Sequence, residues 1–147
     1  MRRIKTDRGL FVTILLSIIT CGIYPFYMIY SLAQDINTVC AEDGQRTTGL
    51  FLYLVLSLLT FGIYPLIWWV KSASRIHQYG VRFGIPVSTS GVTYLLWTLV
   101  GWLVCGIGPY VALYQFLHSL NNIAWHYNNR LAAFYTQQNP YNGANYI

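Results

Sequence analysis

Two of the three histidines in this chain have a spacing that suits a shared ligand. His118 and His126 are eight residues apart with Asn122 midway, so a helix would place all three near one face. Imidazole nitrogens are common metal ligands, and His118 and His126 are therefore ligand candidates for a metal or a haem. A metal normally needs further ligands, and no third ligand or carboxylate accompanies this pair. We expect neither a metal nor another cofactor, and we expect both imidazoles to form hydrogen bonds at a membrane–water boundary.

The other polar side chains are not arranged for catalysis either. Ser17, Thr20 and Ser57 have no base near them in the sequence, so nothing would activate their hydroxyl groups as nucleophiles. Three of the four acidic residues follow the first apolar run, where we expect a solvated polar face: Asp35, Glu42 and Asp43. The sequence therefore predicts that the protein is not an enzyme.

The composition is that of a protein surrounded mostly by lipid. Hydrophobic residues make up 55% of the 147 residues and charged residues only 9%, whereas soluble domains carry about 25% charged residues. The formal net charge of +5 indicates contact with anionic headgroups. No basic run alternates with aromatic residues in a polar groove, as nucleic-acid binding would require. We expect membrane lipid as a partner and no nucleic acid.

A short motif with Gly and Pro interrupts each of three apolar runs. Residues 20–25 read Thr-Cys-Gly-Ile-Tyr-Pro, residues 60–65 read Thr-Phe-Gly-Ile-Tyr-Pro, and residues 105–109 form a looser copy, Cys-Gly-Ile-Gly-Pro. Proline removes a helical hydrogen bond and disfavours helical backbone at the residue before it. We therefore predict a break in each run, serving close helix packing or lining a pore, at nine candidate residues: Gly22, Tyr24, Pro25, Gly62, Tyr64, Pro65, Gly106, Gly108 and Pro109.

The broken runs are long, and none of them contains a charged residue. They extend over residues 10–33, 50–70 and 92–117, and about 20 apolar residues suffice for a helix that crosses a bilayer. Behind each run, apolar residues recur at helical spacing. The pattern predicts an all-α integral membrane protein with three repeated, broken or kinked membrane helices, each continuing into an amphipathic helix. An ion-coupled transporter is disfavoured, because such proteins keep an ionisable group within the membrane.

The recurring order of start, break and extension defines the expected domain organisation. We predict one membrane domain, residues 1–135, composed of three repeats at about residues 9–44, 49–84 and 91–135. Residues 136–147 are rich in Asn, Gln and Tyr. Their composition predicts a disordered tail, with an arm that orders against a neighbouring subunit as the alternative.

The charges between the runs bear on topology. Residues 1–9 hold four basic side chains and one acidic one, residues 34–49 one basic and three acidic, and residues 71–91 three basic and none acidic. Because basic residues are enriched on the cytoplasmic side, this alternation favours a multi-pass protein with three crossings and a cytoplasmic N-terminus.

The breaks support an alternative topology. Residues 10–20 would form only about 16 Å of helix, which is about half of a bilayer. Each unit could then be a re-entrant hairpin that turns at Gly-Ile-Tyr-Pro and leaves the membrane on the side where it entered. Broken backbone at membrane depth must be satisfied by protein or water, which would require the units to shield one another.

The wording of the motif resembles a known family. Residues 17–24, Ser-Ile-Ile-Thr-Cys-Gly-Ile-Tyr, are followed by Tyr-Ser-Leu-Ala-Gln-Asp-Ile-Asn at residues 30–37, and a second copy begins at Ser57. This pattern is similar to that of a bacterial membrane family, domain of unknown function 4234, over about residues 10–127. The resemblance implies a small protein of the bacterial cytoplasmic (inner) membrane. It implies no activity and no catalytic residues.

Two functional hypotheses remain open from the sequence. The first is a non-enzymatic membrane protein that acts by self-assembly into a homo-oligomer or by binding a membrane-protein partner, because the repeats, the small residues at the breaks and the amphipathic extensions suit helix packing. The alternative is an oligomeric channel or pore lined by the Gly-Ile-Tyr-Pro breaks, because unwound segments form solute sites in transporters.

Overall fold

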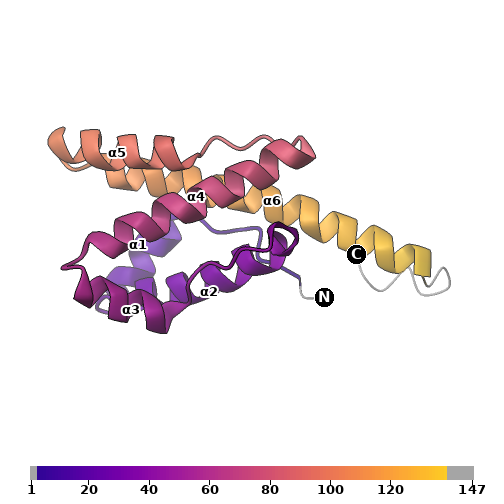
Figure 1. The fold of residues 1–147 in the computed structure, drawn as a ribbon, viewed down its shortest axis with the longest axis horizontal. Helices are drawn as coiled ribbons and strands as arrows, with labels where there is room; N and C mark the ends of the chain where they lie inside the picture. Colours follow the sequence, from indigo (N-terminus) through magenta and orange to yellow (C-terminus); the bar gives the residue numbers. More distant parts are fainter. Residues whose placement is uncertain (1–2, 139–147) are drawn as a thin grey trace.

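The computed structural model describes residues 3–138, and helices are the regular secondary structure of this part of the chain. It contains six α-helices, one short 3₁₀ helix and no strand, which confirms the all-α expectation. Apart from its first three residues, the expected tail lies outside the described residues. The elements shown in Figure 1 are α1 (Leu10–Ile19), α2 (Tyr24–Val39), η1 (Ala41–Asp43), α3 (Leu50–Leu59), α4 (Ile63–Phe83), α5 (Gly91–Leu103) and α6 (Gly108–Gln138).

Each uncharged run is broken into two helices, so of the broken or kinked forms expected from the sequence the structure has the broken one. A short apolar helix (α1, α3 or α5) is followed by a turn and a longer helix (α2, α4 or α6), and the two helices of each pair contact each other. The chain is therefore a series of three helical hairpins. Within residues 3–138, no helix combines the length and the apolar composition that crossing a membrane requires.

The first two turns share a left-handed backbone that ends the short helix. Cys21 and Gly22 have φ angles of 50° and 87°. This conformation lets the amide of Gly22 donate to the carbonyl of Ser17, five residues back, at 2.8 Å. In the second hairpin Gly62 donates to Ser57 at the same distance. Such bonds satisfy the last carbonyls of a helix and stop its propagation, so glycine, more than proline, ends α1 and α3.

The threonine that opens the motif links the two helices of its hairpin. The hydroxyl of Thr20 donates to the carbonyl of Leu16 at 2.7 Å and accepts from the amide of Tyr24 at 2.9 Å. Thr60 repeats this arrangement with equal distances in the second hairpin. One hydroxyl therefore serves both the end of the short helix and the start of the long one. The prolines follow in the first turn of the long helix, where a missing N–H costs little.

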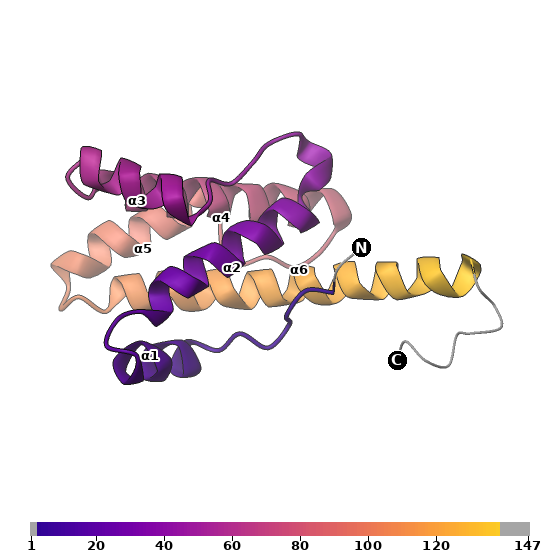
Figure 2. The same ribbon diagram turned by 90° about the horizontal axis from the view of Figure 1, so that it is seen from below.

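The three hairpins pack in a closed ring. The long helices α2, α4 and α6 all contact one another, and each short helix also contacts the long helix of the preceding hairpin: α3 with α2, α5 with α4, and α1 with α6. The last of these contacts joins the two ends of the chain. Figures 1 and 2 show that all three turns lie at the same end of the molecule, from which the long helices diverge.

The core lies where the three long helices meet. Aligning the hairpins on their turn glycines, Gly22, Gly62 and Gly106, makes Ile36, Ile76 and Leu120 equivalent positions. These three side chains have exposed fractions of 0%, 0% and 1%. Neighbouring positions of the same helical stripe are also buried, among them Ala33, Ala73, Leu117, Val39, Tyr79 and Ile123. The interior between the long helices is therefore filled with side chains.

The third hairpin is closed by glycine packing. A Cβ atom added to Gly101 on α5 would lie 2.0 Å from the Cα of Gly108 on α6, and one added to Gly108 would lie 1.9 Å from the carbonyl oxygen of Trp97. The two backbones therefore approach very closely at these glycines, and α5 and α6 pack directly against each other. Small residues at helix interfaces produce such an approach in membrane proteins.

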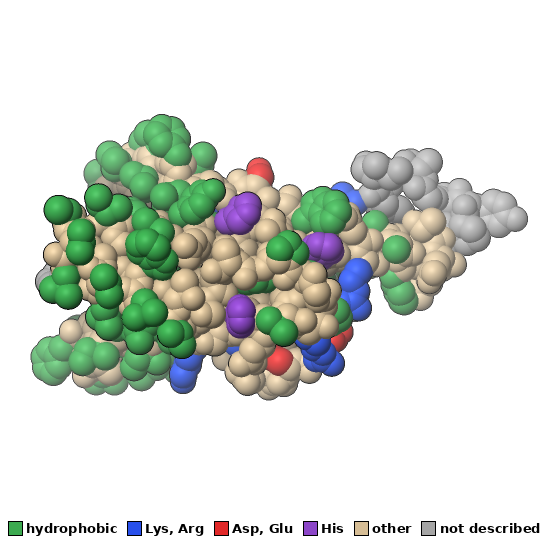
Figure 3. All heavy atoms as spheres, turned by 90° about the horizontal axis from the view of Figure 1, so that it is seen from above, with side chains coloured by type: hydrophobic (Ala, Val, Ile, Leu, Met, Phe, Trp, Pro, Cys, Tyr) green, Lys and Arg blue, Asp and Glu red, His purple; other side chains and the backbone are tan. Residues whose placement is uncertain are grey.

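Large apolar side chains cover the end of the molecule where the turns lie. The short helices and turns expose Phe11, Ile18, Ile19, Ile23, Phe51, Leu58, Leu59, Phe61, Leu103, Val104 and Ile107. Figure 3 shows hydrophobic side chains gathered over this end and most visible charged and histidine side chains over the rest. We call the three turns with the short helices the apolar tip, and the opposite part the polar end.

We predict that Thr60→Val destabilises the protein by about 1 kcal/mol, because valine has the shape of threonine but cannot link α3 to α4. The free energy of unfolding would be measured by denaturant titration in detergent. Thr98→Val is the matched control, since the Thr98 hydroxyl only donates to Tyr94 within α5. An equal loss of stability in both variants would contradict the linking role.

Candidate functional site

The polar end is organised by one buried polar residue in each long helix. In the alignment on the turn glycines, these residues are Asp35, Arg75 and Ser119. Each directly precedes one of the equivalent core residues described above. Their exposed fractions are 2%, 6% and 0%. The same structural position thus holds a carboxylate, a guanidinium and a hydroxyl, all within the protein. Buried polar groups need partners, and these partners define the site.

Each of these residues holds the segment that precedes its own hairpin. We call these the entry segments: residues 3–9, 40–49 and 84–90. Asp35 pairs with Arg8 of the first segment, Arg75 binds the second, and the hydroxyl of Ser119 accepts from the backbone amides of Ser88 and Thr89 in the third. The anchors therefore keep the irregular segments against the helices.

Arg75 makes the largest number of these contacts. Its guanidinium donates two bonds to the carboxylate of Asp43, at 2.8 and 2.9 Å, and further bonds to Asn37, to the Thr47 hydroxyl and to the Gln45 carbonyl, at 2.9, 2.6 and 2.8 Å. The arginine lowers the pKa of Asp43 below its usual value. A fork of fixed N–H donors suits this task, and lysine could not reproduce it.

A second set of side chains, two residues further along, holds the entry segment of the following hairpin. Asn37 exchanges two hydrogen bonds with the backbone of Thr47, at 2.6 and 2.9 Å. His77 bonds the carbonyl of Thr89 at 3.0 Å. Asn121 exchanges two bonds with the backbone of Arg8, at 2.8 and 3.2 Å. Each entry segment is therefore bound by two successive long helices, and α6 holds the first segment, which closes the ring.

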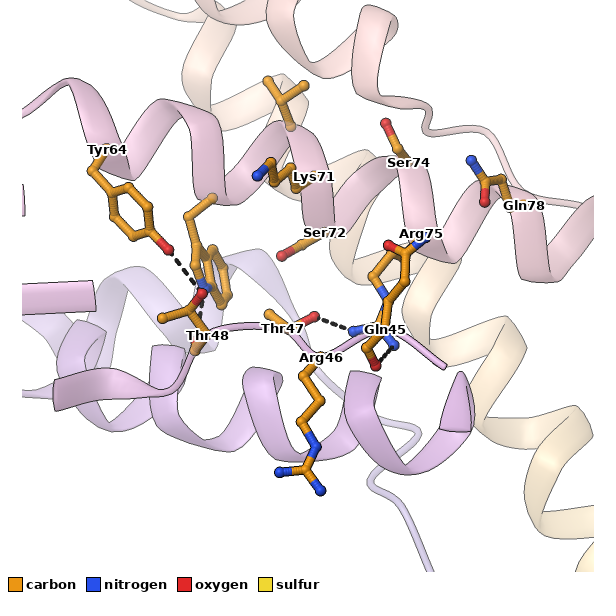
Figure 4. A pocket seen from close by; sticks show the side chains of 12 residues that line it. Gln45, Arg46, Thr47, Thr48, Tyr64, Lys71, Ser72, Ser74, Arg75 and Gln78 are labelled. Atoms are coloured by element: carbon orange, nitrogen blue, oxygen red, sulfur yellow. Dashed lines mark hydrogen bonds between the residues drawn. The ribbon is translucent and has the colours of Figure 1, made fainter. Parts of the chain in front are cut away.

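A pocket lies beside Arg75, between α4 and residues 45–48. Its volume is about 290 Å³. Figure 4 shows Tyr64, Ser72 and Arg75 projecting from α4 toward this stretch. The Tyr64 hydroxyl donates to the Thr48 hydroxyl at 2.8 Å, and the indole of Trp68 donates to the Thr48 carbonyl at 2.9 Å. The pocket is thus built on a segment that the arginine and two aromatic residues hold in place.

The nine break residues lie at the apolar tip or in the first turn of a long helix, away from these anchors. Gly22, Gly62 and Gly106 have positive φ angles at the three turns. The hydroxyl of Tyr64 reaches the second entry segment, where it donates to Thr48. Pro25, Pro65 and Pro109 stand within the first three residues of α2, α4 and α6, and Gly108 packs against α5.

The two candidate histidine ligands do not form a common site. His118 and His126 lie on the uninterrupted helix α6, so their Cα atoms are about 12 Å apart. His118 is exposed and stacks on Tyr114, and His126 packs against Trp125. Among residues 3–138, no cluster of three or more His, Cys, Asp or Glu side chains could hold a metal ion.

The polar anchors were not identified from the sequence. We expected Asp35 to lie on a solvated face, and this is wrong, because its exposed fraction is 2%. Glu42 is exposed as expected, and Asp43 is exposed yet bound to Arg75. The repeat did contain a signal for these anchors, since aligned copies place opposite charges at positions 35 and 75. The sequence did not show that these residues pair with the entry segments.

Comparison with known proteins places the chain in a family. The family described as "Domain of unknown function (DUF4234)" matches residues 8–78 and again residues 48–122. The chain belongs to this family. The comparison with curated proteins found no match, and neither did the comparison with solved structures.

The two overlapping DUF4234 matches correspond to the hairpins. The first covers α1 to most of α4, and the second covers α3 to the first half of α6, so each contains two successive hairpins. Asp35, Arg75 and Ser119 all lie within the matched residues. The anchors and the turns therefore belong to the part of the chain that the family shares.

We predict that Arg75→Lys destabilises the protein by about 2–3 kcal/mol, because lysine keeps the charge but leaves several buried acceptors without a donor. The free energy of unfolding in detergent is the measurement. Arg82→Lys on the same helix is the control and should change the free energy of unfolding by less than about 0.5 kcal/mol. Arg82 is exposed, and its ion pair with Glu42 is long at 3.9 Å. Equal effects would contradict the anchoring role.

Proposed function

We propose that this chain is a non-enzymatic membrane protein that inserts its apolar tip into the bilayer from one side and acts by assembling with itself or with a membrane-protein partner. The bilayer is the bacterial cytoplasmic membrane that the family resemblance implies. In this arrangement the three hairpins are re-entrant, and the polar end with its entry segments stays in the aqueous and headgroup region.

The distribution of exposed side chains carries the proposal. Phe61, at the second turn, is 98% exposed, and Leu58 and Leu103 are each 82% exposed. No charged residue lies in α1, α3, α5 or the three turns. Contiguous apolar patches of this kind mark membrane or protein contacts. The first two turns leave few backbone groups unsatisfied, because glycine amides and threonine hydroxyls already bond the ends of their short helices.

The far half of α6 supports the assembly part of the proposal. This helix extends beyond the other five as a projecting arm (Figures 1 and 2). Trp125 and Phe134 on it are 56% and 50% exposed, and exposed aromatic residues are enriched at protein interfaces. Finding only single chains of 16.9 kDa in native membranes and in mild detergent would contradict assembly.

No specific observation favours the pore alternative. The turn glycines lie at the apolar tip, and the space between the three long helices is occupied by Ile36, Ile76 and Leu120. A path for ions through one chain would have to displace these side chains.

The topology can be tested with single cysteines at positions 5, 46, 82 and 129, which are all exposed. They lie before the first turn, between successive turns and after the last turn. Cys21 and Cys105 would be replaced by serine. Cys40 can remain, since it is 2% exposed and burial raises the pKa of its thiol to about 12. We expect a membrane-impermeant thiol reagent to label all four positions from the same side of the membrane.

The reagent would be applied to intact spheroplasts, which expose one face of the membrane, and to inverted vesicles, which expose the other. Three crossings would instead place positions 5 and 82 on one side and positions 46 and 129 on the other. This alternating pattern would reject re-entrant insertion. Labelling before and after solubilisation in detergent controls for reactivity that depends on the site.

A charge at the apolar tip tests insertion directly. We predict that Phe61→Asp raises the fraction of protein that alkaline carbonate extracts from membranes, because a carboxylate within the bilayer costs about 2.5–3.5 kcal/mol. Aspartate tolerates the left-handed backbone of this position, and the ring of Phe61 is almost fully exposed, so the fold should persist. Val81→Asp, at a position 68% exposed near the polar end of α4, is the matched control. Equal extraction of both variants would count against insertion of the tip.

A further inference from the structure

The second hairpin departs from the other two at one core position. In the alignment on the turn glycines, Ser72 of α4 is equivalent to Leu32 of α2 and Phe116 of α6. All three are buried, with exposed fractions of 1%, 0% and 0%. Two hairpins thus fill this position with a large apolar side chain, while the second has a small hydroxyl. The pocket described beside Arg75 lies at this position.

The hydroxyl of Ser72 has no hydrogen-bond partner within the described part of the chain. It projects from α4 toward the 45–48 stretch, on the pocket side of the helix (Figure 4). A buried hydroxyl without a partner costs about 1–3 kcal/mol. The absence of a partner at a position where the repeat otherwise has an apolar residue points to an acceptor supplied from outside the chain.

The basic side chains around the pocket favour an acceptor with a negative charge. None of the described residues that line it is acidic, and three are basic: Arg46, Lys71 and Arg75. Arg75 is already committed to Asp43, and the guanidinium of Arg46 points away from α4 in Figure 4. Lys71 is exposed, adjoins Ser72, and forms no ion pair within residues 3–138. It is therefore the cation available to a ligand.

The position along α4 suits a ligand at the membrane surface. Lys71 is the first charged residue of α4, after an uncharged stretch at residues 63–70, and lysine side chains at the end of an apolar stretch reach toward the lipid headgroups. The start of the same helix adjoins the apolar tip. If the tip inserts as proposed above, the pocket opens near the headgroups, where phosphate groups are abundant.

We propose that this pocket binds a phosphate group through the ammonium of Lys71 and the hydroxyl of Ser72. The phosphate is either that of an anionic phospholipid headgroup or a free phosphate ion. The lipid source rests on the proposed membrane insertion, whereas the phosphate chemistry does not. Charge-assisted bonds from lysine and a hydroxyl donor are a common way to hold phosphate oxygens.

Calorimetric titration of the full-length protein in detergent tests the proposal. The probes are sodium phosphate, short-chain phosphatidylglycerol and short-chain phosphatidylcholine, which has no net charge. We expect saturable binding of phosphatidylglycerol or of phosphate and at least tenfold weaker binding of phosphatidylcholine. Binding of phosphatidylglycerol but not phosphate identifies a lipid site, and binding of both identifies a site for the phosphate group alone. Absence of binding by both anions overturns the proposal.

Three variants separate the pocket from general charge attraction. Lys71→Gln should weaken binding about fivefold to tenfold, the usual effect of losing one charge-assisted bond at a partly exposed site. Lys5→Gln removes an equal charge from the exposed first entry segment and should leave the affinity unchanged. Ser72→Ala should weaken binding without lowering the thermal midpoint of the unliganded protein, because the hydroxyl forms no bond there. Equal loss in Lys71→Gln and Lys5→Gln, or unchanged binding by Ser72→Ala, would overturn the proposal.

Ser72→Leu gives the second hairpin the residue of the first. We expect it to fill the pocket, to abolish binding and to keep or raise the thermal midpoint. Wild-type affinity in a folded Ser72→Leu protein would place the ligand elsewhere and overturn the proposal. If the variant fails to fold, Ser72→Ala still decides the outcome. Membrane insertion is measured separately by the labelling of cysteines, so failure of this site and failure of the proposed function remain distinguishable.

Discussion

The buried guanidinium of Arg75 is the interaction on which the polar end depends most. It connects α4 to the second entry segment, and it satisfies acceptors on Asp43, Asn37, Thr47 and Gln45 at once. A charge taken out of water is costly unless it is fully paired. The bonds to Thr47 and Gln45 also hold a stretch of chain that has no regular structure. Asp35 and Ser119 perform the same task in the other hairpins with different chemistry. The ring of hairpins is therefore closed by polar side chains as well as by the buried apolar side chains between the long helices.

The opposite end follows a different constraint. In the first two hairpins the backbone there is satisfied locally, by glycines in left-handed conformation and by threonine hydroxyls that bond both helices of a hairpin. The side chains of the short helices are then left to face outward, and most of them are large and apolar. An end without charge and an end with anchored charges, opposite each other on one small protein, are what the proposed insertion from one side requires.

Much of the local structure could be predicted from the sequence, and much of the site could not. Recurrence of Thr-x-Gly-Ile-Tyr located the turns, and helical periodicity identified the all-α class. Whether each run bends or reverses was not determined, because a Gly-Pro break is compatible with both. Asp35 was misassigned for a related reason: its partner Arg8 is 27 residues away, and Asn121, which holds Arg8, is on the last helix.

By itself, the sequence determined the three repeated units, the apolar character of the short helices, the positions of the turns and the kinship with DUF4234. These properties depend on local composition and on residues within about five positions of one another. Only the tertiary structure decided that the hairpins close into a ring, that opposite charges at equivalent positions anchor the entry segments, and that Ser72 leaves an unfilled pocket. Such features arise from contacts between segments distant in the chain, and periodicity along one helix shows which face is buried but not what covers it.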